Sequence, residues 1–255
     1  MQTYKNILVT TANSTYYYSL LTLISGVHTF GLDCVEQIYV FNLGLDISEI
    51  NTLKSLKNVS VVDYPQDYID SHEHSLVPKS YMYKLFCLTY CKNFAENIFW
   101  LDAGAAPINN MCVIYDLIKK DDIFMVGDIH LNRNYTHKTC ANIMEATESE
   151  MNDTQLSAGI IGYKKGGKFD HLFEKAYQYA LQGCTIGQEE NHRNDQSVVS
   201  ILASRYSCPK QDIDVFGYWT DINRNYQTAM ENNAVIFVHR RGYENRQNLI
   251  YENQF

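Results

Sequence analysis

A single carboxylate ends one of the apolar runs of this sequence. The run from Ile98 leads into Asp102, and the residues that follow, AGAAP, are all small. Buried strands of open α/β sheets end at the edge where ligands bind, and residues without bulk let a ligand approach the backbone. We therefore expect Asp102, Ala103 and Gly104 to face a ligand at the edge of a sheet.

A lysine lies at the border of a predicted core-facing helix stripe. Lys84 follows Tyr81 by three residues and precedes Leu88 by four. Its side chain either extends along the apolar face to water or reaches over the sheet edge to a phosphate. The stripe itself consists of Tyr81, Leu85, Leu88, Cys91 and Ala95.

The first apolar run ends in a small polar turn followed by tyrosines. Thr11, Ala12 and Asn13 precede Tyr16, and the fingerprint G-x-G-x-x-G is absent, which argues against the usual NAD or FAD turn. Such a turn can hold a nucleobase, with backbone groups at its edge and a ring on its face. Alternatively, Asn13 or Ser14 caps the next helix and the tyrosines are ordinary surface.

The elements that must position these residues alternate along the first half of the chain. This alternation predicts βαβ units and a doubly wound, mostly parallel α/β sheet flanked by helices, in one domain over residues 1–255. The polar stretch from Leu131 to Asp153 is expected to be a long loop near the functional edge. The expected strands are Asn6–Thr10, Gln37–Phe41, Val59–Asp63, Ile98–Asp102, Ile123–Asp128, Leu156–Tyr163 and Ala234–His239. The expected helices are Thr15–Val27, Ser48–Leu56, Lys79–Ala95, Asn109–Lys119, Phe169–Leu181 and Asp195–Tyr206.

The composition excludes several classes of protein. A formal net charge of −8 and the lack of a basic run argue against nucleic-acid binding. The 7 cysteines are scattered, so a disulfide framework is not expected, and Cys87 and Cys91 are interpreted as buried small hydrophobes. No apolar stretch is long enough to span a bilayer, and the N-terminus lacks the pattern of a signal peptide. We expect a cytoplasmic protein.

Six short segments, taken in order, carry a resemblance to a known family. They are VTTANSTYY, YMYKL, FWLDAGAAPI, LSAGIIGYKKG, NDQSVVSIL and VIFVHRRG. Together they resemble the glycogenin-like and bacterial galactosyltransferase family of nucleotide-sugar glycosyltransferases (family 8), which has the GT-A fold. The resemblance covers nearly the whole chain through short, degenerate motifs.

The resemblance implies a donor site at the first turn and on the helix with Lys84. The family's A-A-D-x-x-Y turn falls on Thr11, Ala12, Asn13 and Tyr16, with Asn13 in place of the acid. Its Y-x-R-L motif, which meets the nucleotide sugar, is matched by Tyr83-Lys84-Leu85 with lysine in place of arginine.

The resemblance also implies a divalent cation, Mn or Mg, on the diphosphate. The family's D-x-D falls on Asp102-Ala103-Gly104, so the second carboxylate is missing, and its H-x-x-G falls on His239 to Gly242. Asp102 and His239 are then the metal ligands, and we expect them within a few ångströms of one another at the C-terminal edge of the sheet. If the lost carboxylate abolishes metal binding, the cations Lys84, Arg240 and Arg241 carry the charge of the leaving group instead.

Two further motifs complete the implied site. The N-S-G strand is matched in part by Ser157-Ala158-Gly159, on the floor of the donor and acceptor site. The D-Q pair corresponds to Asp195-Gln196, either of which could position the reacting anomeric carbon. An alternative for this segment is that Asn194 or Asp195 caps a helix.

The implied function is transfer of a sugar from a nucleotide diphosphate donor, a UDP-sugar, to a hydroxyl of a glycan, protein or other acceptor, with retention. One alternative is a non-catalytic nucleotide-sugar binding module. Another is an S-adenosylmethionine-dependent methyltransferase, because LDAGAAP superficially resembles an acidic glycine loop. A separate cluster, His72-Glu73-His74, is expected to be solvent-exposed rather than a metal site.

Overall fold

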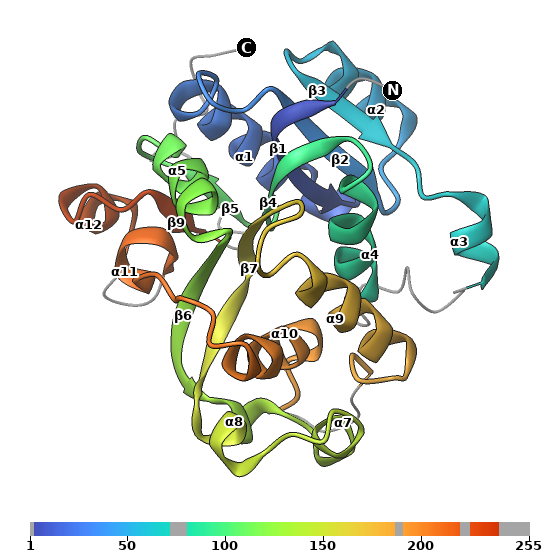
Figure 1. The fold of residues 1–255 in the computed structure, drawn as a ribbon. Helices are drawn as coiled ribbons and strands as arrows, with labels where there is room; N and C mark the ends of the chain where they lie inside the picture. The colour runs from blue at the N-terminus through green and yellow to red at the C-terminus, as the bar shows by residue number, and fades with distance from the viewer. Residues whose placement is uncertain (1–2, 72–80, 187–190, 220–224, 240–255) are drawn as a thin grey trace.

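The computed structural model describes residues 3–71, 81–186, 191–219 and 225–239. Its central sheet has six strands in the order β3–β2–β1–β4–β7–β6 (Figure 1). β1 to β4 run parallel, and β7 runs antiparallel to both neighbours, so the predicted mostly parallel α/β sheet is confirmed. The strands are β1 (Tyr4–Ala12), β2 (Gln37–Asn42), β3 (Val59–Val62), β4 (Ala95–Leu101), β6 (Ile123–Leu131) and β7 (Thr154–Lys164).

The central strand β4 is buried on both faces of the sheet. In β4, Ile98 and Trp100 pack into one hydrophobic cluster, while Phe99 and Leu101 pack into the other. All four side chains are fully buried, which explains why this strand is a continuous apolar run rather than an alternating one.

Helices cover both faces of this sheet (Figure 1). The first face is covered by α4 (Met82–Cys91), α9 (His171–Leu181) and α10 (Asn194–Arg205). The second is covered by α1 (Tyr17–Phe30), α2 (Ile47–Ser55) and α5 (Cys112–Asp121). The short helices are η1 (Ser14–Tyr16), α3 (Gln66–Ser71), α6 (Asn132–Tyr135), α7 (Lys138–Ile143), α8 (Glu148–Asn152), α11 (Ile213–Phe216) and α12 (Tyr226–Glu231). No helix in these described segments is long and apolar enough to cross a membrane.

Helix α4 begins later than its apolar spacing predicts. Tyr81, the residue before its first turn, has a left-handed backbone conformation with φ of 50°, which cannot continue a helix from upstream. Lys79, the predicted start, lies outside the described residues.

The prediction of a long loop from Leu131 to Asp153 is wrong. The stretch forms α6, α7 and α8, each of them short. α8 carries a capping box in which the Thr147 hydroxyl accepts from the Glu150 backbone, so local capping replaces the apolar periodicity that a longer helix would show.

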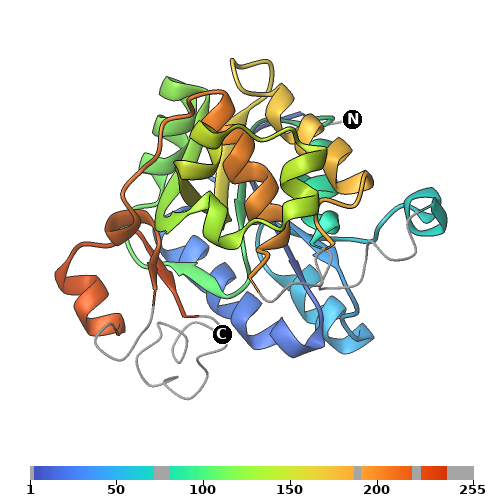
Figure 2. The ribbon, with the colours of Figure 1, turned by 90° about the horizontal axis from the view of Figure 1, so that it is seen from below.

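The last predicted strand does not join the central sheet. β9 (Ile236–Val238) forms a second, three-stranded sheet between β5 (Ala105–Pro107) and β8 (Tyr218–Trp219). Figure 2 shows β5, in green, next to α1, in blue, where Gly26 lies against Pro107. The small residues after Asp102 are therefore a strand that packs on a helix, as well as a loop.

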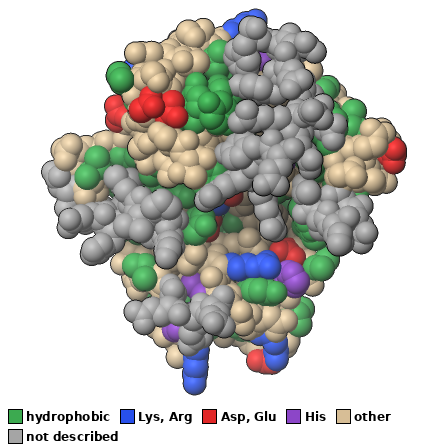
Figure 3. All heavy atoms as spheres, turned by 180° about the vertical axis from the view of Figure 1, so that it is seen from behind, with side chains coloured by type: hydrophobic (Ala, Val, Ile, Leu, Met, Phe, Trp, Pro, Cys, Tyr) green, Lys and Arg blue, Asp and Glu red, His purple; other side chains and the backbone are tan. Residues whose placement is uncertain are grey.

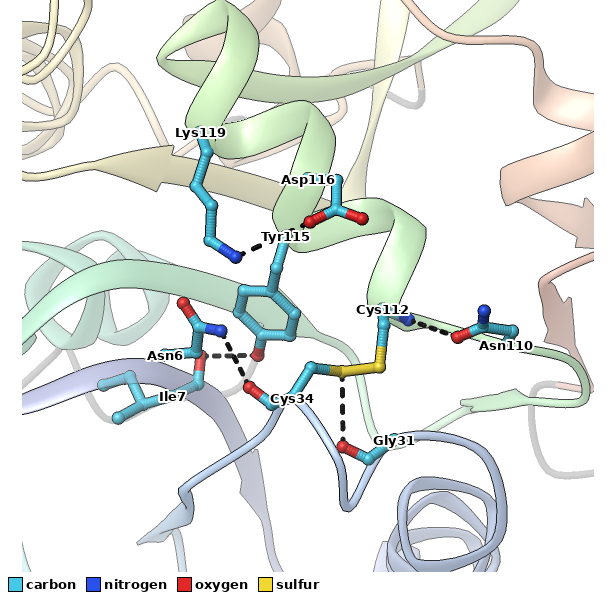
Figure 4. The surroundings of a disulfide bond; sticks show 9 residues. All are labelled: Asn6, Ile7, Gly31, Cys34, Asn110, Cys112, Tyr115, Asp116 and Lys119. Carbon is cyan, nitrogen blue, oxygen red and sulfur yellow. Dashed lines mark hydrogen bonds and ion pairs between the residues drawn. A yellow bond between two sulfur atoms is a disulfide. The ribbon is translucent and has the colours of Figure 1, made fainter.

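Two of the scattered cysteines form a disulfide, contrary to the expectation. Cys34 follows α1 and Cys112 begins α5, and their Cα atoms are 5.6 Å apart (Figure 4). Asn6 donates to the Cys34 carbonyl, and Tyr115 donates to the Ile7 carbonyl, so both ends of the bridge are tied to β1. Spacing in the sequence did not reveal the pair because tertiary packing brings it together. Cys87 and Cys91 are fully buried and free, as predicted.

Candidate functional site

A cavity of about 600 Å³ opens at the carboxyl ends of β1 and β4. The strand order reverses between these two strands, and open α/β sheets bind ligands at such switch points. Figure 3 looks at this face of the molecule and shows it hollowed near its centre. The cavity is lined by Thr11, Ala12, Asn13, Tyr16, Leu43, Tyr81, Tyr83, Asp102, Ala103, Gly104, Ala105, Ser157, Gly159, Ile160, Gln196 and Val238.

Most of the proposed donor residues therefore lie around one cavity, although their segments are far apart in the sequence. Tyr83, which belongs to the motif expected to meet the nucleotide sugar, lines it too, whereas Tyr81 and Leu43 were not predicted to do so. The αL backbone of Tyr81 is a signal that only the structure reveals, and a tyrosine with positive φ is uncommon.

Asp102 is held at the floor of the cavity by two donors. Its Oδ1 accepts from the Trp100 indole Nε1 at 2.6 Å and lies 3.2 Å from the Lys84 Nζ. Its Oδ2 lies so close to Gly159 that a Cβ there would be 2.8 Å away. The glycine therefore leaves room for this carboxylate, and the side chain of Asp102 remains 45% exposed.

Lys84 is buried beneath the cavity rather than extended to water. Its Nζ lies 2.9 Å from the Asp195 Oδ2, and it donates to the Ala158 carbonyl at 3.1 Å. With Asp102 as a third partner, all three N–H groups of the ammonium are engaged by protein. The interpretation that Lys84 snorkels to solvent is wrong, since its side chain is only 3% exposed.

The charges of this cluster depend on one another. Burial alone would lower the pKa of Lys84, but the carboxylates of Asp102 and Asp195 outweigh it and raise that pKa. Burial raises the pKa of Asp195, and the Lys84 ammonium opposes this rise. Lys84 thus bridges Asp102, a partly exposed carboxylate in the cavity, and Asp195, a buried carboxylate behind it. We call these three residues the Lys84 cluster.

The D-Q pair separates into two environments. Asp195 is buried and belongs to the Lys84 cluster, whereas Gln196 lines the cavity. The residue at the N-cap of α10 is Arg193, and it makes no side-chain cap hydrogen bond, so the capping alternative for Asn194 and Asp195 is wrong. Asn194 instead has a left-handed backbone, with φ of 45°.

The capping alternative is also wrong at the first turn. Asn13 makes no side-chain cap hydrogen bond, and the Ser14 hydroxyl donates to Glu49 and to the Gly44 carbonyl. The Asn13 Oδ1 is buried without a hydrogen-bond partner among the described residues, beside the cavity that Tyr16 also lines. An acceptor left in this way is available to a ligand.

His239 directly follows β9 of the second sheet, close to the cavity. Val238 pairs with Ala105, which places the end of β9 next to the loop that begins at Asp102. The prediction that Asp102 and His239 share an edge of the central sheet is wrong, because β9 belongs to the second sheet. His239 is 6% exposed, and its Nε2 has no hydrogen-bond partner within the described segments.

The described residues contain no group of three or more His, Cys, Asp or Glu side chains that could hold a metal ion by themselves. Gly104 stands where the D-x-D motif has its second aspartate, so the carboxylate of that aspartate is missing here. Arg240, Arg241 and Gly242 lie outside the described residues, as do the three residues from His72 to His74.

The sequence matches no protein-family model and no curated protein. The solved structures that resemble it include three glycosyltransferases. The bifunctional glycosyltransferase WbbM, in its apo form, has a TM-score of 0.64 at 13% identity, covering 92% of this chain and 45% of WbbM. The galactosyltransferase LgtC, with donor and acceptor sugar analogues, has a TM-score of 0.57 at 12% identity, covering 92% of this chain and 86% of LgtC.

The third is mouse xyloside xylosyltransferase 1 in its apo form. Its TM-score is 0.56 at 11% identity, and the match covers 92% of this chain and 97% of the xylosyltransferase. This chain spans less than half the length of WbbM and most of the length of the other two. The arrangement of strands, the cavity at the switch point and these likenesses agree: the chain has the GT-A glycosyltransferase fold.

Proposed function

We propose that this chain is a glycosyltransferase that moves a sugar from a nucleoside diphosphate donor, a UDP-sugar, to a hydroxyl of a carbohydrate or protein acceptor, with retention. The observation that carries the proposal is the cavity at the switch point, with Asp102 on its floor and Gly104 in its wall. A diphosphate can approach the backbone of Ala103 and Gly104 because no side chain bulk intervenes.

The residues of the cavity divide the work of such a reaction. Cleavage of the donor leaves negative charge on the diphosphate and positive charge on the sugar, so catalysis requires groups that stabilise both. Asn13 and Tyr16 are placed to hold the nucleobase, and Ser157 and Gly159 form the floor under the sugar. Gln196 is the member of the D-Q pair that meets the sugar, while Asp195 acts through Lys84.

A divalent cation fits two of the residues present. The Asp102 Oδ2 is not engaged by Lys84 or Trp100, and the His239 Nε2 lacks a partner among the described residues. We propose that these two atoms would hold Mn or Mg, which prefers oxygen and histidine nitrogen ligands of this kind. When bound, the cation would neutralise the charge that develops on the diphosphate.

A screen of donors tests the proposed function. We expect UDP and UDP-sugars to raise the thermal midpoint, because a ligand that binds only the folded state stabilises it, and UDP-sugars to release UDP slowly in the presence of Mn. S-adenosylmethionine should have no effect. Stabilisation without any release of UDP would instead identify a binding module, and a response to S-adenosylmethionine alone would indicate a methyltransferase.

The proposed cation predicts a dependence on pH that differs from that of an ordinary histidine. Burial lowers the pKa of His239 to about 4, so the ring stays neutral, and able to bind a metal, well below pH 6. We expect Mn to tighten UDP binding about equally at pH 7 and pH 5.5, measured by calorimetry. The His239→Ala variant should lose the effect of Mn, whereas His28→Ala, which changes a half-buried histidine bonded to the Lys57 carbonyl, should keep it. An effect of Mn that survives in His239→Ala would contradict the assignment.

A further inference from the structure

We infer that Arg193 is a positioning residue that fixes which face of the Gln196 amide meets the donor sugar, an inference that rests on the proposed function. Arg193 Nη1 donates to the Asp128 Oδ2 at 2.7 Å and to the Gln155 Oε1 at 3.2 Å. The Gln196 Nε2 donates to the same Gln155 oxygen at 3.0 Å and lies 3.5 Å from the Asp128 Oδ2. We call these four side chains the Arg193 network.

The chemistry of the four groups allows one direction of hydrogen bonding. A guanidinium only donates and an ionised carboxylate only accepts. Arg193 therefore requires Gln155 to present its oxygen, and this buried oxygen together with Asp128 then requires Gln196 to present its nitrogen. An amide has one nitrogen and one oxygen, so the Gln196 Oε1 is the polar atom that remains for a ligand in the cavity.

Arg193 is itself held in place from several sides. Its guanidinium lies 3.8 Å from the centre of the Tyr135 ring, and its backbone N–H donates to the Tyr135 carbonyl at 3.1 Å. The Ser197 hydroxyl donates to the same carbonyl at 2.6 Å. The left-handed backbone of Asn194 then turns the chain between Arg193 and the D-Q pair. A side chain supported in this way can impose an orientation on its neighbours.

The orientation has a consequence for the reaction. As the donor bond breaks, the anomeric carbon gains positive charge, and the partial negative charge of an amide oxygen stabilises it, whereas an amide NH₂ would oppose it. Arg193 pairs with both Gln155 and Asp128 and so holds their oxygens on the same side of its guanidinium. Without Arg193, the Gln155 amide can rotate and the Gln196 amide is free to invert.

The experiment compares Arg193→Met with Arg193→Lys in the whole chain. We expect Arg193→Met to lower kcat for UDP release from the UDP-sugar by about 10- to 100-fold, because misplacement of a positioned group costs this much. The dissociation constant for UDP should stay within about twofold, since the member of the network that lines the cavity is Gln196, which we assign to the sugar. Arg193→Lys, which keeps a charge on Asp128, should recover part of kcat. Arg133→Met, which removes an exposed arginine paired with Glu148, is the matched control and should leave kcat unchanged.

A second measurement does not depend on turnover. The side-chain amide of Gln196, assigned with Gln196→Met, should shift in the ¹H–¹⁵N spectrum of Arg193→Met and not in that of Arg133→Met. An unchanged Gln196 amide, or an unchanged kcat, would overturn the inference. If Arg193→Met does not fold, Asp128→Asn removes the charge at the other end of the pair. The same changes in kcat and in the Gln196 amide are then expected from Asp128→Asn, and their absence would overturn the inference. If the parent releases no UDP from any donor, the proposed function fails, and the amide spectrum still decides whether Arg193 orients Gln196.

Discussion

Replacing Lys84 with methionine is expected to lower the free energy of unfolding by roughly 3 to 5 kcal/mol, because Asp102 and Asp195 then lose the cation that they share. Lys84 is 3% exposed, and water cannot take the place of its ammonium beside Asp195, which is 5% exposed. Urea denaturation at pH 7 measures the loss. Such a large effect distinguishes a buried bridge from an exposed ion pair, which contributes at most about 1 kcal/mol.

The pH dependence of the Lys84→Met variant follows from the pKa of Asp195. Burial raises this pKa in the folded protein, so ionisation of Asp195 costs stability as the pH rises through the folded value, and Lys84 reduces that cost. Without the lysine the pKa rises further. The deficit of the variant should therefore be largest at pH 7 and shrink on acidification, as Asp195 takes up a proton in the folded variant.

Two variants control this prediction. Lys164→Met breaks an ion pair with Asp122 in which the lysine is 44% exposed, and it should cost little. The double variant Lys84→Met/Asp195→Asn removes the unpaired buried charge and should recover part of the stability. A Lys84→Met protein as stable as the parent, with weaker UDP binding, would mean that the lysine serves the ligand rather than the cluster.

Substitution of Gly104 by leucine is expected to weaken UDP-sugar binding by on the order of 100-fold or more, equivalent to about 2.7 kcal/mol, while the protein stays folded. Gly104 lines the cavity, and its φ is not in the left-handed region, so the backbone does not require glycine here. The leucine side chain would then project into the space that we assign to the diphosphate. Calorimetry with UDP and the thermal midpoint measure the two parts of the prediction.

Gly104→Asp is compared with Gly104→Leu because it changes the charge at the same position. It restores a second carboxylate beside Asp102 without filling the cavity as fully as leucine does. We expect UDP binding that depends more strongly on Mn than in the parent, because a cation held by one carboxylate and one histidine gains a further oxygen ligand. Gly104→Leu that binds UDP-sugars as well as the parent would show that the diphosphate lies elsewhere and that the loop is only a tight connection between β4 and β5.

Prediction from the sequence succeeded where the physical cause is local. The continuous apolar run before Asp102 indicated a strand buried on both faces, and β4 is such a strand. It was less accurate where short polar elements rely on caps, as in the stretch from Leu131 to Asp153. Prediction from the sequence also placed Ala234 to His239 in the wrong sheet. An apolar run of that length can pair with β5 and β8 as well as it can with a long parallel strand, so the run alone does not identify its partners.

The sequence by itself determined the mostly parallel sheet, the edge at which Asp102 ends its strand and the small residues that leave room beside it. These depend on side-chain periodicity and size, which are properties of neighbouring residues. Only the tertiary structure decided that Lys84 bridges Asp102 and Asp195, that Arg193 pairs with Asp128 and Gln155 and that Cys34 meets Cys112. Each of these contacts joins segments that lie far apart in the chain, and packing of helices on the sheet, rather than any local pattern, brings their atoms within bonding distance.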